Sequence, residues 1–150
     1  MIIREVTLKD MPKVIVAIES YSKELEGYGR SFDAESTQQS FKRFVEDDNV
    51  SALIAEEDKN IVGMCGIITV PFITDSSSIR AYEFMWHSDP KLSAYKRYKI
   101  QIKLLIEMER IAKEKNVKSI TISTNSENTM SGYLMKQGYI ILELSMVKEV

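Results

Sequence analysis

The segment from Asp89 to Ile100, DPKLSAYKRYKI, joins an apolar, strand-like run to a long helical pattern and contains no glycine. A helix N-terminus offers unsatisfied N–H groups and a partial positive charge, so such a junction suits a phosphate group. Glycine usually helps because a backbone without Cβ can approach phosphate closely. Lys96, Arg97 and Lys99 leave two interpretations open: they supply charge to a phosphorylated ligand, or they form a solvated basic end of the helix.

Glu83 and His87, which precede this junction in the sequence, have side chains that could exchange protons. Glu83 would act as a general base if burial raised its pKa toward neutrality, and otherwise it is an exposed strand residue or a partner of Arg80. His87 is the only histidine and could titrate near neutral pH, although a single histidine on a strand is commonly structural. Regular alternation predicts Glu83, Met85 and His87 on one face of the strand. Trp86 then lies on the other face, as a core residue.

A framework of alternating strands and helices must position these residues. The apolar periodicity gives the order β-α-α-β-β-β-α-β-α-β, which predicts one α/β domain over residues 1–150 with a mixed sheet and an antiparallel meander in its middle. The expected strands are 2–7, 50–57, 61–72, 79–88, 117–124 and 139–150, and the expected helices are 8–25, 33–47, 98–116 and 125–138. Asp10 and Asp33 are the expected N-caps, and Gly138 is expected to end the last helix.

The composition of the 150-residue chain narrows the classes of function. A net charge of −2 gives no bulk electrostatic reason to expect nucleic acid or an anionic membrane as a partner. The apolar runs are too short to span a bilayer, and the sequence begins without the pattern of a secretory signal. A single histidine and a single cysteine argue against a His–Cys metal cluster, and Cys65 is expected to be an inert core thiol. We therefore expect a cytoplasmic protein without a metal, nucleic-acid or membrane partner.

Several segments together resemble one family. Residues 82–90, YEFMWHSDP, are similar to a strand that reads roughly E-L-F-W-W-V-D-P in small members of the GNAT superfamily of N-acetyltransferases. Residues 70–81 and 143–149 also resemble segments of these short, often phage-encoded members. Residues 133–139, YLMKQGY, resemble the late helix of the family, usually L-Y-x-x-x-G-F. The order and spacing of these segments extend the resemblance over nearly the whole chain.

The resemblance implies a GNAT fold, with a mixed, mostly antiparallel central sheet and flanking helices. It also implies acetyl-CoA as the acetyl donor and an amine, on a small molecule or a peptide, as the acceptor. In this family, backbone amides of the loop hold the pyrophosphate, and pantetheine lies where the strand before the loop and the strand after the long helix splay apart. A base deprotonates the ammonium, the amine attacks the thioester directly in a ternary complex, and an acid protonates the departing thiolate.

The loop pattern of the family, Q/R-x-x-G-x-G/A, falls on residues 93–98. Ser93 stands at the basic position, and Lys96 and Tyr98 stand at the two small positions. These side chains either turn outward and leave the main-chain amides open, or fold inward and close the phosphate site. The residues that the resemblance places at the cofactor are His87, Ser88, Ser93, Ala94, Tyr95, Lys96, Arg97, Tyr98, Asn125 and Asn128. Helix capping is an alternative role for the two asparagines.

The resemblance also assigns the catalytic candidates. Glu83 stands where the short members have a glutamate and is the candidate base. The proton-donating tyrosine of the family normally lies four residues before the glycine that ends the late helix, where this chain has Leu134. Tyr133, the candidate acid, lies one residue earlier, a rotation of about 100° on a helix. On the acceptor side, residues 21–32 either attract an amine or form a solvated helix end.

Two functions follow as hypotheses. The first is an N-acetyltransferase that uses acetyl-CoA and an amine acceptor. The second is a non-catalytic GNAT-fold protein for binding or assembly, for example in a phage, with a degenerate CoA site, and the altered loop and displaced tyrosine favour it. The edge strand expected at residues 139–147 would also allow a homodimer.

Overall fold

The computed structural model describes residues 1–24, 32–124 and 129–142, and its strands form one sheet in the order β1-β2-β3-β4-β5. The first four strands pair antiparallel, and β5 pairs parallel to β4. The strands are β1 (Ile2–Glu5), β2 (Val50–Glu57), β3 (Asn60–Phe72), β4 (Asp75–Ser88) and β5 (Ser119–Thr121). The helices are the 3-10 helix η1 (Leu8–Asp10), α1 (Met11–Glu24), α2 (Ala34–Glu46), α3 (Ala94–Glu114) and α4 (Thr129–Lys136). This confirms the predicted α/β fold with a mixed, mostly antiparallel sheet.

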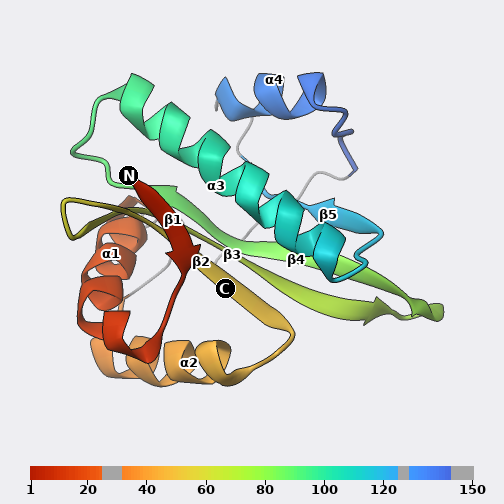
Figure 1. The fold of residues 1–150 in the computed structure, drawn as a ribbon, viewed down its shortest axis with the longest axis horizontal. Helices are drawn as coiled ribbons and strands as arrows, with labels where there is room; N and C mark the ends of the chain where they lie inside the picture. Colours follow the sequence, from red (N-terminus) through yellow and green to blue (C-terminus); the bar gives the residue numbers. More distant parts are fainter. Residues whose placement is uncertain (25–31, 125–128, 143–150) are drawn as a thin grey trace, which may run out of the picture.

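Helices cover both faces of the sheet. Figure 1 shows α3 and α4 on one side of it and α1 and α2 on the other. Each face of the sheet carries a hydrophobic core, and successive side chains of β2 belong to different cores. Leu53 and Ala55 pack toward α3, whereas Ile54 packs toward α1 and α2. The buried residues of α3 are those of its predicted apolar stripe: Ile100, Leu104, Leu105, Met108, Ile111 and Ala112. This packing fixes the axis of α3 against the sheet and so determines where the helix begins.

Two aspartates stabilise helix starts, in different ways. Asp33 is the N-cap of α2, as predicted, and its carboxylate accepts from the N–H of Ser36 at 2.6 Å. Asp10 is not an N-cap, contrary to the prediction. Thr7 holds that position before η1, and Asp10 accepts from its N–H and hydroxyl at 2.9 and 2.8 Å. The physical reason is Arg4 of β1, which donates to both oxygens of Asp10 at 2.8 and 2.7 Å.

Replacing Asp10 with asparagine is expected to lower the free energy of unfolding at pH 7 by about 2 kcal/mol, because it removes a charge-assisted, bidentate pair with Arg4. The hydrogen bond from Arg4 holds the pKa of Asp10 well below its usual range. Since the folded-state pKa is depressed, this stabilisation is present above the unfolded-state pKa and is lost as the pH falls through the folded one.

Urea unfolding at pH 7, 4 and 2.5 should therefore show the difference between the wild type and Asp10→Asn narrowing in acid. A difference that stays constant with pH would contradict the assignment. Glu19→Gln is the control, because Glu19 forms an exposed pair with Lys23 and should contribute less than about 0.5 kcal/mol.

The β3–β4 hairpin is longer than predicted. Its turn occupies residues 73–74 rather than 74–78, so β4 begins at Asp75, and Figure 1 shows the hairpin extending past the other strands. The carboxylate of Asp75 accepts from the N–H of Ser77 at 3.1 Å, and the guanidinium of Arg80 lies 3.5 Å from the centre of the Phe72 ring. The polar residues 75–78 are typical of a turn, and these contacts stabilise them as the first part of β4.

The C-terminal part of the fold also differs from the prediction. β5 covers only residues 119–121 of the expected strand 117–124. Residues 139–142 are not a strand, and residues 143–150 of the same predicted strand lie outside the described residues. The chain turns back toward α3 here, because Gly138 ends α4 with φ +91°, as predicted, and the hydroxyl of Tyr139 donates to Glu109 at 2.8 Å.

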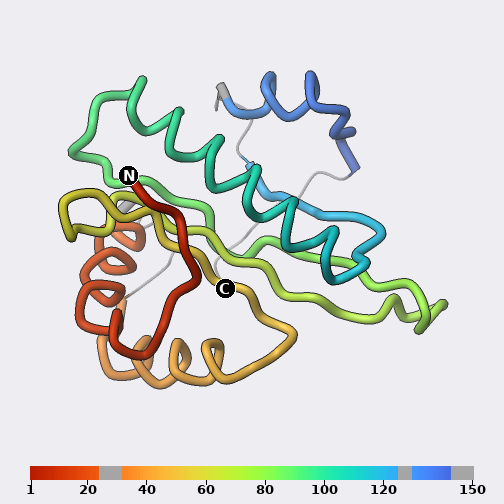
Figure 2. The backbone as a smooth tube through the Cα atoms, viewed as in Figure 1, coloured from red at the N-terminus to blue at the C-terminus, as the bar shows by residue number. Residues whose placement is uncertain are grey.

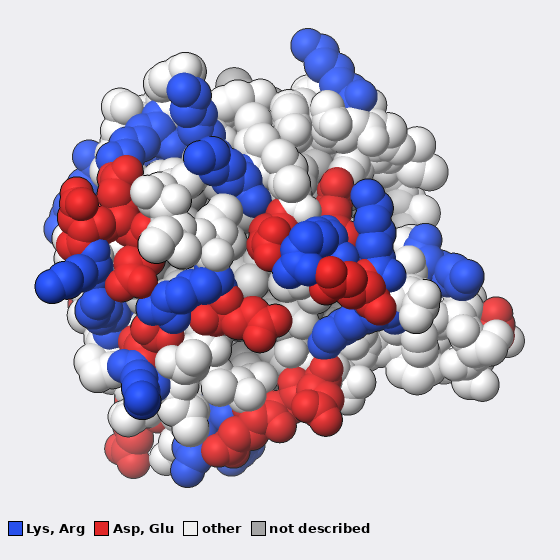
Figure 3. All heavy atoms as spheres, in the orientation of Figure 1, with Lys and Arg blue, Asp and Glu red and all other residues white. Residues whose placement is uncertain are grey.

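Charge is mixed on the surface. Figure 3 shows basic and acidic side chains interspersed on the face it presents. Among the described helices, none combines the length and the apolar character that crossing a membrane requires.

Candidate active site

The last third of β4 contains a β-bulge. Gly66 and Ile67 are consecutive in β3, yet they lie opposite Met85 and Glu83, so Phe84 is an extra residue in β4. Phe84 and Met85 consequently both face α1 and α2. Gly66 makes room for this arrangement, because a Cβ there would lie 2.2 Å from the Phe84 ring.

Glu83 therefore lies on the opposite face from Met85 and His87, contrary to the prediction. Its partner across the ladder is Ile67, a residue of the core beneath α3, whereas Met85 and His87 face α1. The expected alternation fails because the bulge inserts one residue between Glu83 and Met85. The carboxylate of Glu83 accepts a hydrogen bond from the N–H of Ser123, just beyond β5, at 3.2 Å.

β4 and β5 separate at this point. Their parallel pairing covers Arg80–Tyr82 and Ser119–Thr121, and past Tyr82 no described strand pairs with this edge of β4. The opposite edge remains paired with β3 as far as Ser88. The separation agrees with the splay that the family resemblance implies, and the side chain of Glu83 reaches across its start.

A loop with a turn at residues 90–92 leads from the end of β4 into α3, and Figure 2 shows the path of the chain between the two elements. The carbonyl of Asp89 accepts from the N–H of Leu92 at 3.1 Å, and its carboxylate accepts from the N–H of Lys91 at 3.0 Å. The N–H of Asp89 donates to the carbonyl of Val62 at 3.0 Å, which ties the turn to β3. The direction in which the chain enters α3 is thus set by the sheet.

Main-chain donors are exposed at the start of α3. Ser93 is the N-cap, and its hydroxyl accepts from the N–H of Lys96 at 3.4 Å. Within the described part of the chain, the N–H groups of Ala94 and Tyr95 have no hydrogen-bond partner, and both residues are exposed. Two donors therefore face solvent at the positive end of the helix dipole, which is an arrangement that suits an anion.

The bulky side chains at the two small positions of the loop pattern contact residues of other elements. Lys96 forms an ion pair with Glu57 at the end of β2, and its hydrogen bond lowers the pKa of that carboxyl group. Tyr98 packs edge-on against Tyr133 of α4, with ring centroids 6.1 Å apart. These contacts favour the interpretation in which both side chains turn away from the loop amides.

Two further basic residues lie at this end of α3. The Nε of Arg97 donates to the hydroxyl of Ser88, the buried last residue of β4, at 3.3 Å. The ammonium of Lys99 lies 4.3 Å from the centre of the Tyr95 ring. Arg97 therefore places a positive charge between the end of the strand and the start of the helix.

The remaining predicted residues are distributed around this junction. Tyr133 is half-buried against the α3 core, while Leu134, at the usual position of the family tyrosine, is 5% exposed and belongs to that core. His87 is 4% exposed, and its ring lies 5.0 Å from that of Tyr21 in α1. Trp86 faces α3 and donates to the carbonyl of Gln101 at 3.1 Å. Asn125 and Asn128 lie outside the described residues.

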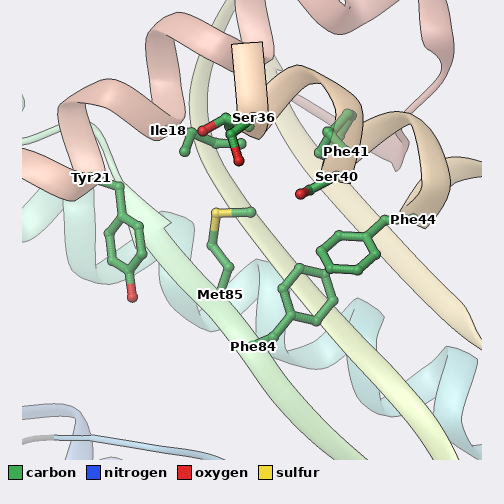
Figure 4. A pocket seen from close by; sticks show the side chains of 9 residues that line it. Ile18, Tyr21, Ser36, Ser40, Phe41, Phe44, Phe84 and Met85 are labelled. Atoms are coloured by element: carbon green, nitrogen blue, oxygen red, sulfur yellow. The ribbon is translucent and has the colours of Figure 1, made fainter. Parts of the chain in front are cut away.

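A pocket of about 250 Å³ lies on the α1 and α2 side of β4 (Figure 4). Its apolar lining consists of Ile18, Tyr21, Phe41, Phe44, Phe84 and Met85. Three hydroxyl groups, of Ser36, Thr37 and Ser40, line it from α2. The sequence analysis did not predict this pocket. The signal available was the presence of serines and phenylalanines on one face of the second helix.

Other reactive groups are accounted for by packing. Burial raises the pKa of the Cys65 thiol, which is 1% exposed, as expected of an inert core cysteine. Among the described residues there is no group of three or more His, Cys, Asp or Glu side chains that could hold a metal ion.

Solved structures share this fold. A GNAT family acetyltransferase from Staphylococcus aureus has a TM-score of 0.73 at 16% identity, over 99% of this chain and 98% of the other. A predicted acetyltransferase with acetyl-CoA from Clostridium acetobutylicum also has a TM-score of 0.73, at 18% identity over 99% and 95% of the two chains.

An aminoglycoside acetyltransferase from an uncultured soil metagenomic sample, in complex with sisomicin, has a TM-score of 0.71 at 18% identity over 99% and 93% of the two chains. No protein-family model and no curated protein sequence matches this chain. The described architecture is the GNAT acetyltransferase fold.

Proposed function

We propose that this chain, which has the GNAT fold, is an N-acetyltransferase that transfers an acetyl group from acetyl-CoA directly to an amine. The observation that carries the proposal is the geometry at the end of β4. The strand loses its β5 partner past Tyr82, and the chain then leads to the exposed N–H groups of Ala94 and Tyr95 at the start of α3. An extended ligand with a phosphate at one end would suit this combination of an unpaired strand edge and a helix N-terminus.

The residues present fit acetyl-CoA, which would supply an activated acetyl thioester. The amides of Ala94 and Tyr95 would bind the pyrophosphate, with Arg97 adding charge. Backbone groups between Phe84 and Ser88 would contact the pantetheine, because no described strand pairs with that edge of β4. Ser93 holds the first turn of α3 in place through its cap.

Proton transfers would be carried out by side chains beside the strand separation. Glu83 is the proposed base and would take the ammonium proton through a water molecule, since its carboxylate lies where β4 and β5 part. Tyr133, whose ring packs against Tyr98, is the proposed proton donor to the thiolate. His87 faces α1 and would contribute to the acceptor side of the strand rather than to the phosphate site.

Calorimetric titration of the full chain with acetyl-CoA and with CoA tests the proposal, followed by assay of thiol release with a panel of amines. We expect binding of both ligands and amine-dependent release of CoA. No heat at millimolar acetyl-CoA would overturn the proposal and leave the alternative, a non-catalytic GNAT-fold binding protein.

Replacing Arg97 with alanine is expected to raise the Kd for acetyl-CoA about tenfold, because a charge-assisted contact with phosphate is lost. Arg110→Ala is the charge-matched control on the same helix, since Arg110 lies in its C-terminal half, where it pairs with Glu107 and Glu114. Calorimetry at two salt concentrations should show weaker salt dependence for Arg97→Ala than for Arg110→Ala. Equal affinities for the two variants would place the phosphates elsewhere.

A further inference from the structure

We infer that the pocket between α1, α2 and β4 binds the apolar part of the acceptor, and that the acceptor is a primary monoamine carrying one aromatic or similarly bulky apolar group. The inference rests on the proposed acetyl transfer and specifies the class of amine that it uses.

The shape and lining of the pocket suit one ring. Phe41 and Met85 are 2% and 5% exposed, and the rings of Phe44 and Phe84 lie 5.2 Å apart at 50° to each other (Figure 4). An apolar cavity of about 150 Å³ can hold benzene. The pocket of about 250 Å³ therefore has room for a benzene-sized ring with a short chain, which would gain free energy by leaving water.

The charge of the lining favours a monoamine over a polyamine. No carboxylate belongs to the described lining, whose polar groups are the hydroxyls of Ser36, Thr37 and Ser40 and of Tyr21. A second ammonium group placed among these aromatic rings would lose hydration without a counter-charge, which is costly. One hydroxyl can still hydrogen-bond to a polar substituent on the ring.

The pocket is also close to the proposed chemistry. Phe84 and Met85 line it and directly follow Glu83 in the strand, at a spacing of about 3.3 Å per residue, although Glu83 lies on the α3 face of β4 and the pocket lies on the α1 and α2 face. Tyr21, another lining residue, contacts His87 near the end of the same strand. An apolar group seated here would hold an attached amine beside the bulge, and the amine would approach the α3 face across the edge of β4 that has no described partner past Tyr82.

Acceptor preference gives the first test. At saturating acetyl-CoA, we expect kcat/KM for 2-phenylethylamine to exceed that for spermidine by at least tenfold. Equal or reversed preference would overturn the inference. Ser40→Glu should reduce this preference at least tenfold relative to Ser40→Gln, which has a similar size and no charge. Identical preferences in the two variants would show that the amine binds elsewhere.

A binding measurement that needs no turnover separates this inference from the proposed function. With methyl-13C-methionine in the full chain, and with the Met85 signal assigned through Met85→Leu, 2-phenylethylamine should shift the Met85 methyl resonance through its ring current, and spermidine should not. A shift without acetyl transfer would support the pocket and overturn the catalytic proposal. Acetyl transfer to 2-phenylethylamine without any shift would overturn the pocket assignment and keep the catalytic proposal.

Discussion

Replacing Glu83 with glutamine is expected to lower kcat for acetyl transfer about a hundredfold at neutral pH, while the Kd for acetyl-CoA changes less than twofold. Loss of a positioned general base typically costs at least about 10² in rate. Glutamine keeps an oxygen that can accept the hydrogen bond from the N–H of Ser123, so the separation of β4 and β5 should be preserved. Fixed-time assays of thiol release measure kcat, and calorimetry measures the Kd for acetyl-CoA independently.

The pH dependence distinguishes a base from a structural residue. Without a base, the variant can use only amine that is already deprotonated in solution, so the deficit of Glu83→Gln relative to the wild type should shrink as the pH approaches the pKa of the acceptor amine. Glu114→Gln is the control, because Glu114 lies at the exposed C-terminal end of α3 in a pair with Arg110. Unchanged turnover in Glu83→Gln would move the search for the base to His87, on the α1 face of the same strand.

The face of β4 on which Glu83 lies is a feature that the sequence did not predict. The composition of β4 correctly predicts a strand, and strict alternation then assigns a face to each side chain. The bulge breaks this alternation, and it depends on tertiary packing: Gly66 in β3 leaves the space that the Phe84 ring fills. Neither residue alone indicates that the register will shift, so the face of Glu83 could not be read from the sequence.

Features that depend on neighbouring residues were predicted better than the bounds of the elements, since α3 begins at Ala94 rather than at Tyr98 as expected. The apolar stripe of α3 and the cap at Asp33 depend on residues close together in the sequence, and both are found as expected. The role of Asp10 could not be predicted from its neighbours in the sequence, because its carboxylate binds Arg4, which belongs to β1. The length of β5 likewise depends on how many residues of β4 lie close enough to form backbone hydrogen bonds with it.

The two parts of the candidate site differ in the same way. The proposed phosphate-binding end was predictable because a strand, a turn and a helix start follow one another in residues 82–98. The proposed acceptor pocket brings together Tyr21 from α1, Phe41 from α2 and Phe84 from β4. Such a pocket exists only once helices distant in sequence are packed on the sheet, so side-chain type alone could not define it.

Replacing Gly63 with valine is expected to lower the free energy of unfolding by about 3 kcal/mol and to weaken acetyl-CoA binding. A Cβ at this position would lie 2.5 Å from Cγ2 of Ile100, and 3.1 Å from both Cδ1 of Leu104 and the carbonyl oxygen of His87. Ile100 and Leu104 are 1% and 0% exposed, so they have no free space to move into. The strain should be relieved by lifting the N-terminal half of α3 from the sheet, which displaces the amides of the first turn.

A graded series tests this steric explanation. Gly63→Ala should cost about 2 kcal/mol, less than valine, and each kcal/mol should lower Tm by roughly 2–4 °C in a chain of this size. Gly132→Ala in α4 is the control, since nothing lies within 4 Å of its added Cβ, and it should stabilise the helix by roughly 0.5–1 kcal/mol. If the Gly63 variants lose stability but retain wild-type affinity for acetyl-CoA, the start of α3 is not the phosphate site. A parallel loss of both would link the close approach of helix and sheet to cofactor binding.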